Sequence, residues 1–177
     1  MRDSSSCCFS LFRRFVFVPI SIFLFLTASS FRPCRSLSAE MLQMREDMIG
    51  VAQQFVGIRY RYAGVNPGTG FDCSGFTSYI LKKFDAQVSS SSSLQSKQGI
   101  KVPLSDVLPG DLVFFGRRGR GIQHVAMVVE NSADGIICVH ATCSRGVVVE
   151  NVSTSAYWRP RILFARDVLG QREFASN

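Results

Sequence analysis

The sequence predicts an α+β domain in which helices come first and an antiparallel sheet follows. Between residue 38 and about residue 99, apolar residues recur at helical spacing or are broken by turns. Beyond Pro103 the pattern changes to short apolar runs that are separated by short loops, and short connections favour antiparallel pairing. Because the helical and strand patterns are segregated along the chain, the fold class is α+β.

The first thirty residues have the pattern of a secretory signal peptide. Two arginines precede the apolar run at residues 15–28, and small residues follow it. The run is too short to be a comfortable membrane span, which disfavours the alternative of an uncleaved anchor. Twin-arginine export and a lipoprotein formed at Cys34 both fit the flanking residues poorly. We therefore expect cleavage near Ser30 and export to the periplasm, cell envelope or extracellular space, with the membrane contacted only through this segment.

The next segments predict two helices joined by a turn-rich stretch. Ser38 is placed to cap a helix that runs to about Val56, before the natural stop at Gly57. Residues 63–70 are rich in turn formers, and a second helix is predicted over residues 73–84. The apolar stripe of the first helix is expected to be Leu42, Ile49, Ala52, Phe55 and Val56, and that of the second Phe76, Tyr79, Ile80 and Phe84.

A run of serines, Ser89 to Ser93, follows the second helix and has the composition of a flexible linker. A short helical turn is predicted at residues 95–99. The remaining pattern predicts about five strands, with a hairpin-like loop at residues 117–121. The predicted strands cover residues 111–115, 124–129, 135–140, 146–150 and 161–165.

Charge and cysteine content narrow the possible functions. The formal charge is +7, and removal of residues 1–30, which hold three arginines and one aspartate, leaves +5. No nucleic-acid-binding motif accompanies this charge, and the arginines at 117, 118 and 120 are expected to form a solvated loop, so we predict no nucleic-acid partner. Outside the cytoplasm Cys138 and Cys143 could pair as a disulfide, although two small buried apolar residues are the favoured interpretation.

One cysteine is placed for chemistry. Cys73 begins the second predicted helix, where free N–H groups and the helix dipole favour the thiolate, which is the nucleophilic form. The two histidines of the chain, His124 and His140, begin and end successive predicted strands, so antiparallel pairing would bring them together. One can then act as base and the other can orient it. The N–H of Cys73 and a neighbouring side chain could form an oxyanion hole, which predicts a cysteine hydrolase.

These residues also carry a family resemblance. From about Gln43 to Val168 the chain resembles the NlpC/P60 cell-wall peptidases, which have a papain-like α+β fold with the nucleophile at a helix N-terminus. The pieces that match, in order, are Tyr60–Gly64, Phe71–Phe76, Pro109–Phe115, His124–Val128, Val139–Ala141 and the closing stretch from Tyr157.

The resemblance implies roles for particular residues. Cys73 matches the nucleophile, His124 the general base, and His140 the polar residue that orients the base. Tyr60 matches a tyrosine near the oxyanion and substrate, and Asp72 and Ser74 flank the nucleophile, where some members bind the amino end of the peptide. The implied organisation is a signal peptide at 1–30, a short segment at 31–38, a catalytic domain at 39–170 and a tail at 171–177.

The implied reaction is hydrolysis of amide bonds in peptidoglycan stem peptides, with the bond between D-glutamate and the following diamino acid as the usual target. It requires no cofactor and no metal, and we expect a monomer. The chain departs from the family pattern at Ala63 and Ala126, where glycine is usual, and at Val88 to Ser92, where a Leu-Pro-Arg-Thr-Ser segment is usual. The last departure removes an arginine that often faces the substrate, which leaves the peptide preference open. The match also places the serine run inside the domain, against the linker interpretation.

Three other functions fit parts of the pattern. Cys138, His140 and Cys143 gather three possible zinc ligands, but their spacing matches no common zinc motif. A catalytically silent wall-binding module on the same fold is the second alternative, and the presence of the cysteine and both histidines disfavours it. The third is acyl transfer or another amidase reaction, since the same nucleophile and fold can serve other acyl groups.

Overall fold

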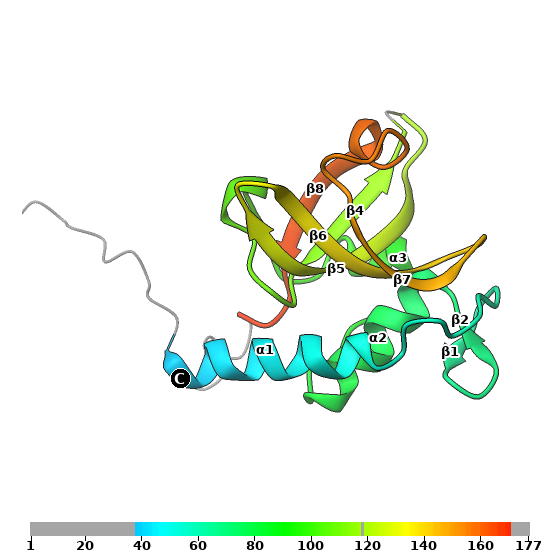
Figure 1. Cartoon of the computed structure of the whole chain (residues 1–177), viewed down its shortest axis with the longest axis horizontal. Coiled ribbons are helices and arrows are strands. Elements are labelled where there is room, and N and C mark those ends of the chain that lie inside the picture. Colours follow the sequence, from blue (N-terminus) through cyan, green and yellow to red (C-terminus); the bar gives the residue numbers. More distant parts are fainter. Residues whose placement is uncertain (1–37, 118, 171–177) are drawn as a thin grey trace, which may run out of the picture. The chain divides into compact units, whose positions relative to one another are not determined.

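The computed structural model describes residues 38–117 and 119–170, which form helices followed by a sheet (Figure 1). The predicted signal peptide, its cleavage site, residues 31–37 and the tail at 171–177 lie outside these residues. The helices are α1 (Ala39–Gln53), α2 (Cys73–Lys83) and the short α3 (Ser92–Gln95). A two-stranded hairpin of β1 (Val65–Asn66) and β2 (Gly70–Phe71) stands between α1 and α2.

The sheet has six strands in the order β3-β8-β4-β5-β6-β7, and every neighbouring pair is antiparallel. The α+β prediction is therefore confirmed, whereas the expectation of about five strands misses β3. That strand has only three residues and pairs with β8 from the far end of the chain, so no local pattern reveals it. The strands are β3 (Ile100–Val102), β4 (Leu112–Gly116), β5 (Ile122–Ser132), β6 (Gly135–Thr142), β7 (Gly146–Asn151) and β8 (Ile162–Asp167).

Helix α1 begins where the sequence predicts but ends earlier, and its buried face contains Ile49 and Ala52 of the predicted stripe. The hydroxyl of Ser38 accepts a hydrogen bond from the Met41 amide at 3.2 Å, which satisfies one free N–H of the first turn. Leu42 and Val56, expected in the apolar stripe, are 43% and 49% exposed. The buried side chains of the helix are Arg45, Met48, Ile49 and Ala52.

The buried arginine of α1 ties the helix to the sheet. The Arg45 guanidinium contacts Asp111 Oδ1 at 2.7 Å and Asp167 Oδ1 at 2.9 Å, and it donates to the Pro109 carbonyl at 2.8 Å. Burial raises the pKa of Asp111 to about 6, although the charge of Arg45 acts in the opposite direction. Arg45 thus holds the first helix on the sheet through ion pairs, at a position where periodicity alone would predict an apolar residue.

The sheet buries side chains on both faces. The helices pack on one face, where Phe71 and Phe76 join Phe114 and Met127 in the larger core (Figure 1). On the other face Phe115, Ala126 and Cys138 pack with Trp158, which comes from the loop before β8. Because Phe114 and Phe115 are both fully buried or nearly so, β4 is apolar on both sides, as its continuous apolar sequence suggests.

The serine run belongs to the folded domain, so the linker interpretation from composition is wrong. The segment leads into α3, one residue of which, Gln95, is fully buried. Its amide nitrogen donates to the carbonyls of Ser74 at 3.0 Å and Ser89 at 2.6 Å, and its amide oxygen accepts from the Thr77 hydroxyl at 3.0 Å. One buried side chain therefore fixes the serine segment against the first turns of α2.

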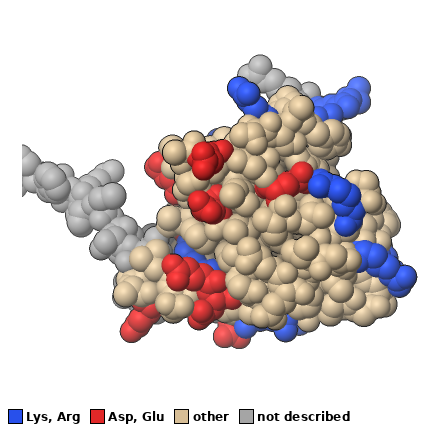
Figure 2. Space-filling view, viewed as in Figure 1, with Lys and Arg blue, Asp and Glu red and all other residues tan. Residues whose placement is uncertain are grey.

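The outer surface carries separate groups of charge. On the face in Figure 2, acidic side chains gather mostly on the left and along the bottom, and the basic ones lie mainly at the upper and right edges. On this face the basic side chains of the described residues form separate groups and no continuous basic surface. Among the residues that the structure describes, no helix is both long enough and apolar enough to cross a membrane.

Candidate active site

Cys73 is the first residue of α2, as the sequence predicts, and Asp72 is the cap of that helix. The Oδ1 atom of Asp72 accepts hydrogen bonds from the Gly75 amide at 2.6 Å and from the Ser74 hydroxyl at 3.1 Å. These bonds satisfy the start of the helix and fix the backbone on both sides of the cysteine. Asp72 and Ser74 thereby have a local structural role, and their contact with a substrate stays a prediction.

A close backbone contact positions the start of α2. A Cβ atom on Gly75 would lie 2.0 Å from the Gly64 carbonyl oxygen, so only glycine fits there. The Asp72 amide also donates to that carbonyl at 3.0 Å. Two glycines from two of the sequence motifs thus hold the helix N-terminus against the hairpin.

The ionisation of Cys73 differs from the expectation. Burial raises the pKa of the Cys73 thiol, and the nearby Asp72 carboxylate acts in the same direction. The backbone N–H of Val125 hydrogen-bonds with the sulfur and, with the N–H groups of Ser74 and Cys73, acts to lower the pKa. The helix start does favour the thiolate, but burial outweighs it, so the thiol stays protonated and needs a base. The Val125 contact places the sulfur beside the backbone that directly follows His124.

The two histidines lie on neighbouring strands and touch. Met127 of β5 pairs with Val139 of β6; His140 lies one residue beyond that pair and His124 three residues before it, towards the same end. They are therefore diagonal neighbours on one face of the sheet. The Nε2 atom of His124 lies 2.8 Å from Nδ1 of His140. The expectation that antiparallel pairing brings the two rings together is confirmed by this geometry.

A third strand extends the contact to a carboxylate that sequence reasoning did not single out. The Nε2 atom of His140 lies 2.9 Å from Glu150 Oε1. The same oxygen accepts from the Trp158 indole at 2.9 Å and from Arg145 at 2.6 Å. In the sequence Glu150 is visible only as the residue that follows the valine run of β7. A glutamate at a strand end is ordinarily solvated, so this position gave no indication of a functional role.

Burial keeps both imidazoles neutral. It lowers the pKa of His124 to about 3, and the His140 charge acts in the same direction. Burial also lowers the pKa of His140, against the opposite effect of the Glu150 hydrogen bond. Burial acts to raise the pKa of Glu150, but hydrogen bonds from His140 and Trp158 outweigh it and the net pKa is lowered. The described group is therefore a neutral imidazole pair that ends on a carboxylate.

The Trp158 indole forms one wall around the histidines. Its ring stacks on His124 with centroids 4.6 Å apart and meets His140 edge-on at 5.0 Å. The sequence marks this tryptophan only as part of a closing motif, and its place beside both rings appears once β8 is folded beside β4.

Tyr60 lies near the cysteine, as the resemblance implies. It bridges to Phe71, two residues before Cys73. Burial raises the pKa of the Tyr60 hydroxyl, and a hydrogen bond with the Cys143 thiol and the nearby Cys73 and Asp72 add to the effect. A tyrosine that stays protonated keeps an O–H that can donate to a developing oxyanion.

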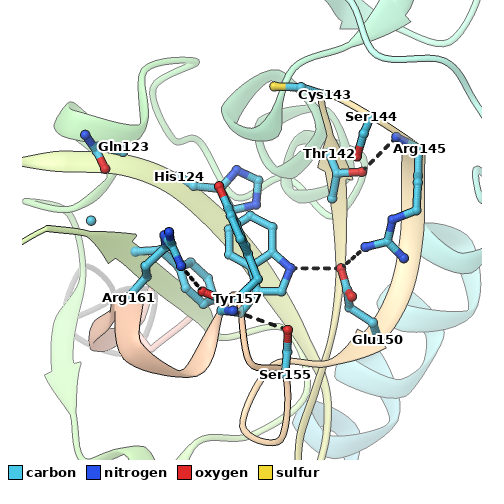
Figure 3. A pocket seen from close by; sticks show the side chains of 13 residues that line it. Gln123, His124, Thr142, Cys143, Ser144, Arg145, Glu150, Ser155, Tyr157 and Arg161 are labelled. Atoms are coloured by element: carbon cyan, nitrogen blue, oxygen red, sulfur yellow. Dashed lines mark hydrogen bonds and ion pairs between the residues drawn. The ribbon is translucent and has the colours of Figure 1, made fainter.

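A cavity of about 490 Å³ opens on the side of the site that carries His124 (Figure 3). Figure 3 shows Thr142, Cys143 and Ser144 at one end, Gln123 and Arg161 at the other, and the His124 ring between them; Trp158 also lines the cavity. Arg161 stacks on the Tyr157 ring at 3.8 Å and donates to the Tyr157 carbonyl. The cavity thus has an aromatic wall with polar groups at both ends, which suits a peptide with polar side chains.

Cys138 and Cys143 are unpaired and have different surroundings. Cys138 is fully buried in the core that contains Trp158, as the favoured interpretation expects, whereas Cys143 is exposed and lies beside Tyr60, against that interpretation. Both nitrogens of His140 are engaged by His124 and Glu150. The three proposed zinc ligands therefore face different partners, and the residues present do not form a metal site.

Cys73 begins a helix and lies beside β5, the strand that carries His124, and His124 contacts a second histidine, His140. This arrangement places the chain among the cysteine peptidases. More narrowly, the chain belongs to the NlpC/P60 family: the model of that family matches residues 57–167. This is the family whose motifs the sequence carries, and it comprises cysteine peptidases and peptidoglycan hydrolases.

Individual relatives support the assignment. The chain is 34% identical over 133 residues to the γ-DL-glutamyl hydrolase of Bacillus subtilis, covering 73% of this chain and 31% of that protein. It is 35% identical over 114 residues to the γ-D-glutamyl-L-lysine dipeptidyl-peptidase of Bacillus cereus, covering 63% and 33%. The chain thus spans about a third of the length of these curated relatives.

Among solved structures, the NlpC/P60 domain of the peptidoglycan hydrolase SagA superposes with a TM-score of 0.58 at 30% identity. The match covers 70% of this chain and 97% of that domain. The described fold therefore corresponds to a whole NlpC/P60 domain.

Proposed function

We propose that this protein is an exported cysteine endopeptidase that hydrolyses amide bonds in peptidoglycan stem peptides. The observation that carries the proposal is the 2.8 Å contact between His124 Nε2 and His140 Nδ1. His124 lies on β5, and the next residue of that strand, Val125, supplies its backbone N–H to the Cys73 sulfur. A protonated thiol beside the strand that carries a neutral, partly buried imidazole suits general-base activation of a nucleophile.

The proposed reaction proceeds through a thioester. His124 takes the thiol proton as Cys73 Sγ attacks the carbonyl carbon, and the oxyanion receives hydrogen bonds from the Cys73 N–H and the Tyr60 hydroxyl. His124 then gives that proton to the leaving amine as the C–N bond breaks. Water attacks the carbonyl carbon of the thioester as His124 takes one of its protons. The C–S bond then breaks, the acyl group leaves as the free carboxylic acid, and His124 returns the proton to the Cys73 thiolate. His140 holds the base through both steps.

The proposed scissile bond follows D-glutamate and precedes the diamino acid of the stem. The names of both Bacillus relatives specify a γ-glutamyl group, and this supports the same acyl group here. Asp72 and Ser74, beside the nucleophile, are proposed to lie near the amino end of the peptide, as the resemblance implies. The export signal predicted at residues 1–30 supports an extracytoplasmic site of action.

The test is digestion of purified muropeptides of known composition by the wild-type protein and by Cys73→Ser, with the products identified by mass spectrometry. We expect a new amine and a new γ-carboxyl at the D-glutamyl bond with wild type only. Identical product profiles for the two proteins would instead favour a silent wall-binding module. Cleavage at another amide would retain the peptidase and correct the bond.

A further inference from the structure

The hydrogen-bonded group at the site does not end at the second histidine. We propose that Glu150 is a positioning residue that sets the tautomer of both histidines and thereby directs the basic nitrogen of His124 toward Cys73. The inference rests on the proposed function for its role in catalysis, but the hydrogen-bond order that it states concerns the protein alone.

The geometry requires one order of donors. A carboxylate can only accept hydrogen bonds, so the contact of 2.9 Å between Glu150 Oε1 and His140 Nε2 makes Nε2 of His140 the donor. A neutral imidazole has one N–H, so Nδ1 of His140 must accept. The contact of 2.8 Å then makes Nε2 of His124 the donor, and Nδ1 of His124 carries the free lone pair.

The strand register fixes the three side chains in the positions that this order of hydrogen bonds needs. His124, His140 and Glu150 come from β5, β6 and β7, three consecutive neighbours in the sheet. Glu150 is paired with Cys138, two residues before His140, so it is the diagonal neighbour of His140 on the same face. All three side chains are thus held by the backbone ladder in one diagonal line.

Glu150 is itself held in place. Its Oε1 atom accepts from the buried Trp158 indole at 2.9 Å and from Arg145 at 2.6 Å in addition to His140. Trp158 lies against both imidazole rings, so the group that orients the carboxylate also restricts the rings. Three donors on one oxygen favour the ionised form, which is the form that can only accept.

The consequence for the reaction is electrostatic. When His124 takes the thiol proton it becomes an imidazolium, and its Nε2–H donates more strongly to His140. The negative charge of Glu150 stabilises that state through the neutral ring between them. Removal of the charge should therefore slow proton transfer without changing how substrate binds.

The first test is direct observation of the tautomers. The chain contains two histidines in total, so protein labelled with ¹⁵N-histidine and purified through a tag that lacks histidine gives signals from His124 and His140 alone. We expect both rings as the Nε2–H tautomer at neutral pH. A ring in the Nδ1–H form would overturn the proposal, and this measurement needs neither activity nor a variant.

The second test uses Glu150→Gln, which keeps an oxygen acceptor but removes the charge. We expect kcat on a stem peptide to fall about 10- to 100-fold, with KM within about twofold of wild type. Alkylation of Cys73 by iodoacetamide at neutral pH, followed on its own peptide by mass spectrometry, should slow about 3- to 10-fold. Glu150→Asp, which restores the charge on a shorter side chain, should recover part of both rates.

Glu130→Gln is the matched control, because Glu130 is an exposed glutamate on β5 of the same sheet; it should leave both rates unchanged. A Glu150→Gln protein with wild-type kcat and alkylation rate would overturn the proposal, as would a rise in KM alone, which would assign Glu150 to substrate contact. If wild type cleaves no muropeptide, the proposed function fails, and the tautomers and the Cys73 alkylation rate still decide the role of Glu150.

Discussion

His124 and His140 share a hydrogen bond of 2.8 Å across two neighbouring antiparallel strands. Sixteen residues of sequence separate them, and the short turn between β5 and β6 returns the chain so that the end of one strand meets the start of the other. Because burial, complete for His140 and partial for His124, keeps both rings neutral, the pair can receive a proton from a thiol. Several measurable consequences follow from this contact and from the residues around it.

The pH dependence of hydrolysis should be displaced toward acid. The base must be neutral to accept a proton, and burial lowers the pKa of His124 from its ordinary 6.5 to about 3, so the imidazole stays neutral well below pH 6.5. We expect kcat/KM to persist below pH 6 and to fall only at more acidic pH. Measurement of kcat/KM between about pH 4 and 9, with Cys73→Ser as background, checks this. A half-maximal rate near pH 6.5 would contradict it.

Replacement of His140 should slow catalysis more than it destabilises substrate binding. His140→Ala removes the acceptor of the His124 N–H, and we expect kcat/KM to fall about 100-fold or more. His140→Asn retains an oxygen acceptor and should lose about tenfold. Thermal unfolding of both variants controls for loss of fold. Activity of His140→Ala within twofold of wild type would remove His140 from the proposed machinery.

Gln95→Leu should release the serine segment. The change leaves the Thr77 hydroxyl and the carbonyls of Ser74 and Ser89 without their buried partner, at a cost of about 2–4 kcal/mol of unfolding free energy. Denaturant unfolding measures the loss, and limited proteolysis should show new cleavage in the serine run. Gln87→Leu, at an exposed position before the run, is the control, with a change within about 0.5 kcal/mol.

Arg45→Met should destabilise the domain because it leaves two carboxylates near the core without their cation. Asp111 has a side chain only 2% exposed and Asp167 one that is 16% exposed, and loss of one partner from such a group costs about 3–5 kcal/mol. Arg120→Met, on an exposed loop, should change stability by less than about 0.5 kcal/mol. Equal denaturation midpoints for the two variants would show that the buried cluster contributes nothing.

Ala63→Gly should stabilise the protein. Ala63 has φ of 54°, a left-handed conformation that costs a residue with a Cβ atom about 1–2 kcal/mol. Glycine removes that strain but adds entropy to the unfolded chain, so we expect a net gain of about 0.5–1 kcal/mol. Ala156→Gly, which lies outside the left-handed region, should instead lose stability. A gain at both positions would disprove the strain.

The strand order shows how far local pattern reaches. Alternation and turn residues located five of the six strands, because each is bounded by glycine, asparagine or proline. β3 escaped because, within residues 38–117 and 119–170, it pairs only with β8, more than sixty residues later. The buried face of α1 was predicted only in part for a related reason: Arg45 is buried by two aspartates that no local pattern associates with it.

The candidate site was located from sequence through its cysteine and histidines, whose spacing already matched a family. The direction of the Cys73 pKa shift was predicted wrongly. The helix N-terminus predicts a lowered pKa, whereas burial against β5 raises it. The glycine motifs show the same division. The sequence marks Gly64 and Gly75 separately, and the fold shows why each is needed: a Cβ on Gly75 would collide with the Gly64 carbonyl oxygen, and a Cβ on Gly64 would collide with the Gly70 carbonyl oxygen.

Residue types and their spacing determined the fold class, the nucleophile candidate and the two histidine candidates, because helix caps, periodicity and short loops act over a few residues. Tertiary structure alone decided that Glu150 and Trp158 join them, that Gln95 anchors the serine run, and that burial keeps the thiol and the imidazoles uncharged. These properties depend on strand register and on distance from water. Both are set by contacts between segments far apart in the chain, which no local pattern specifies.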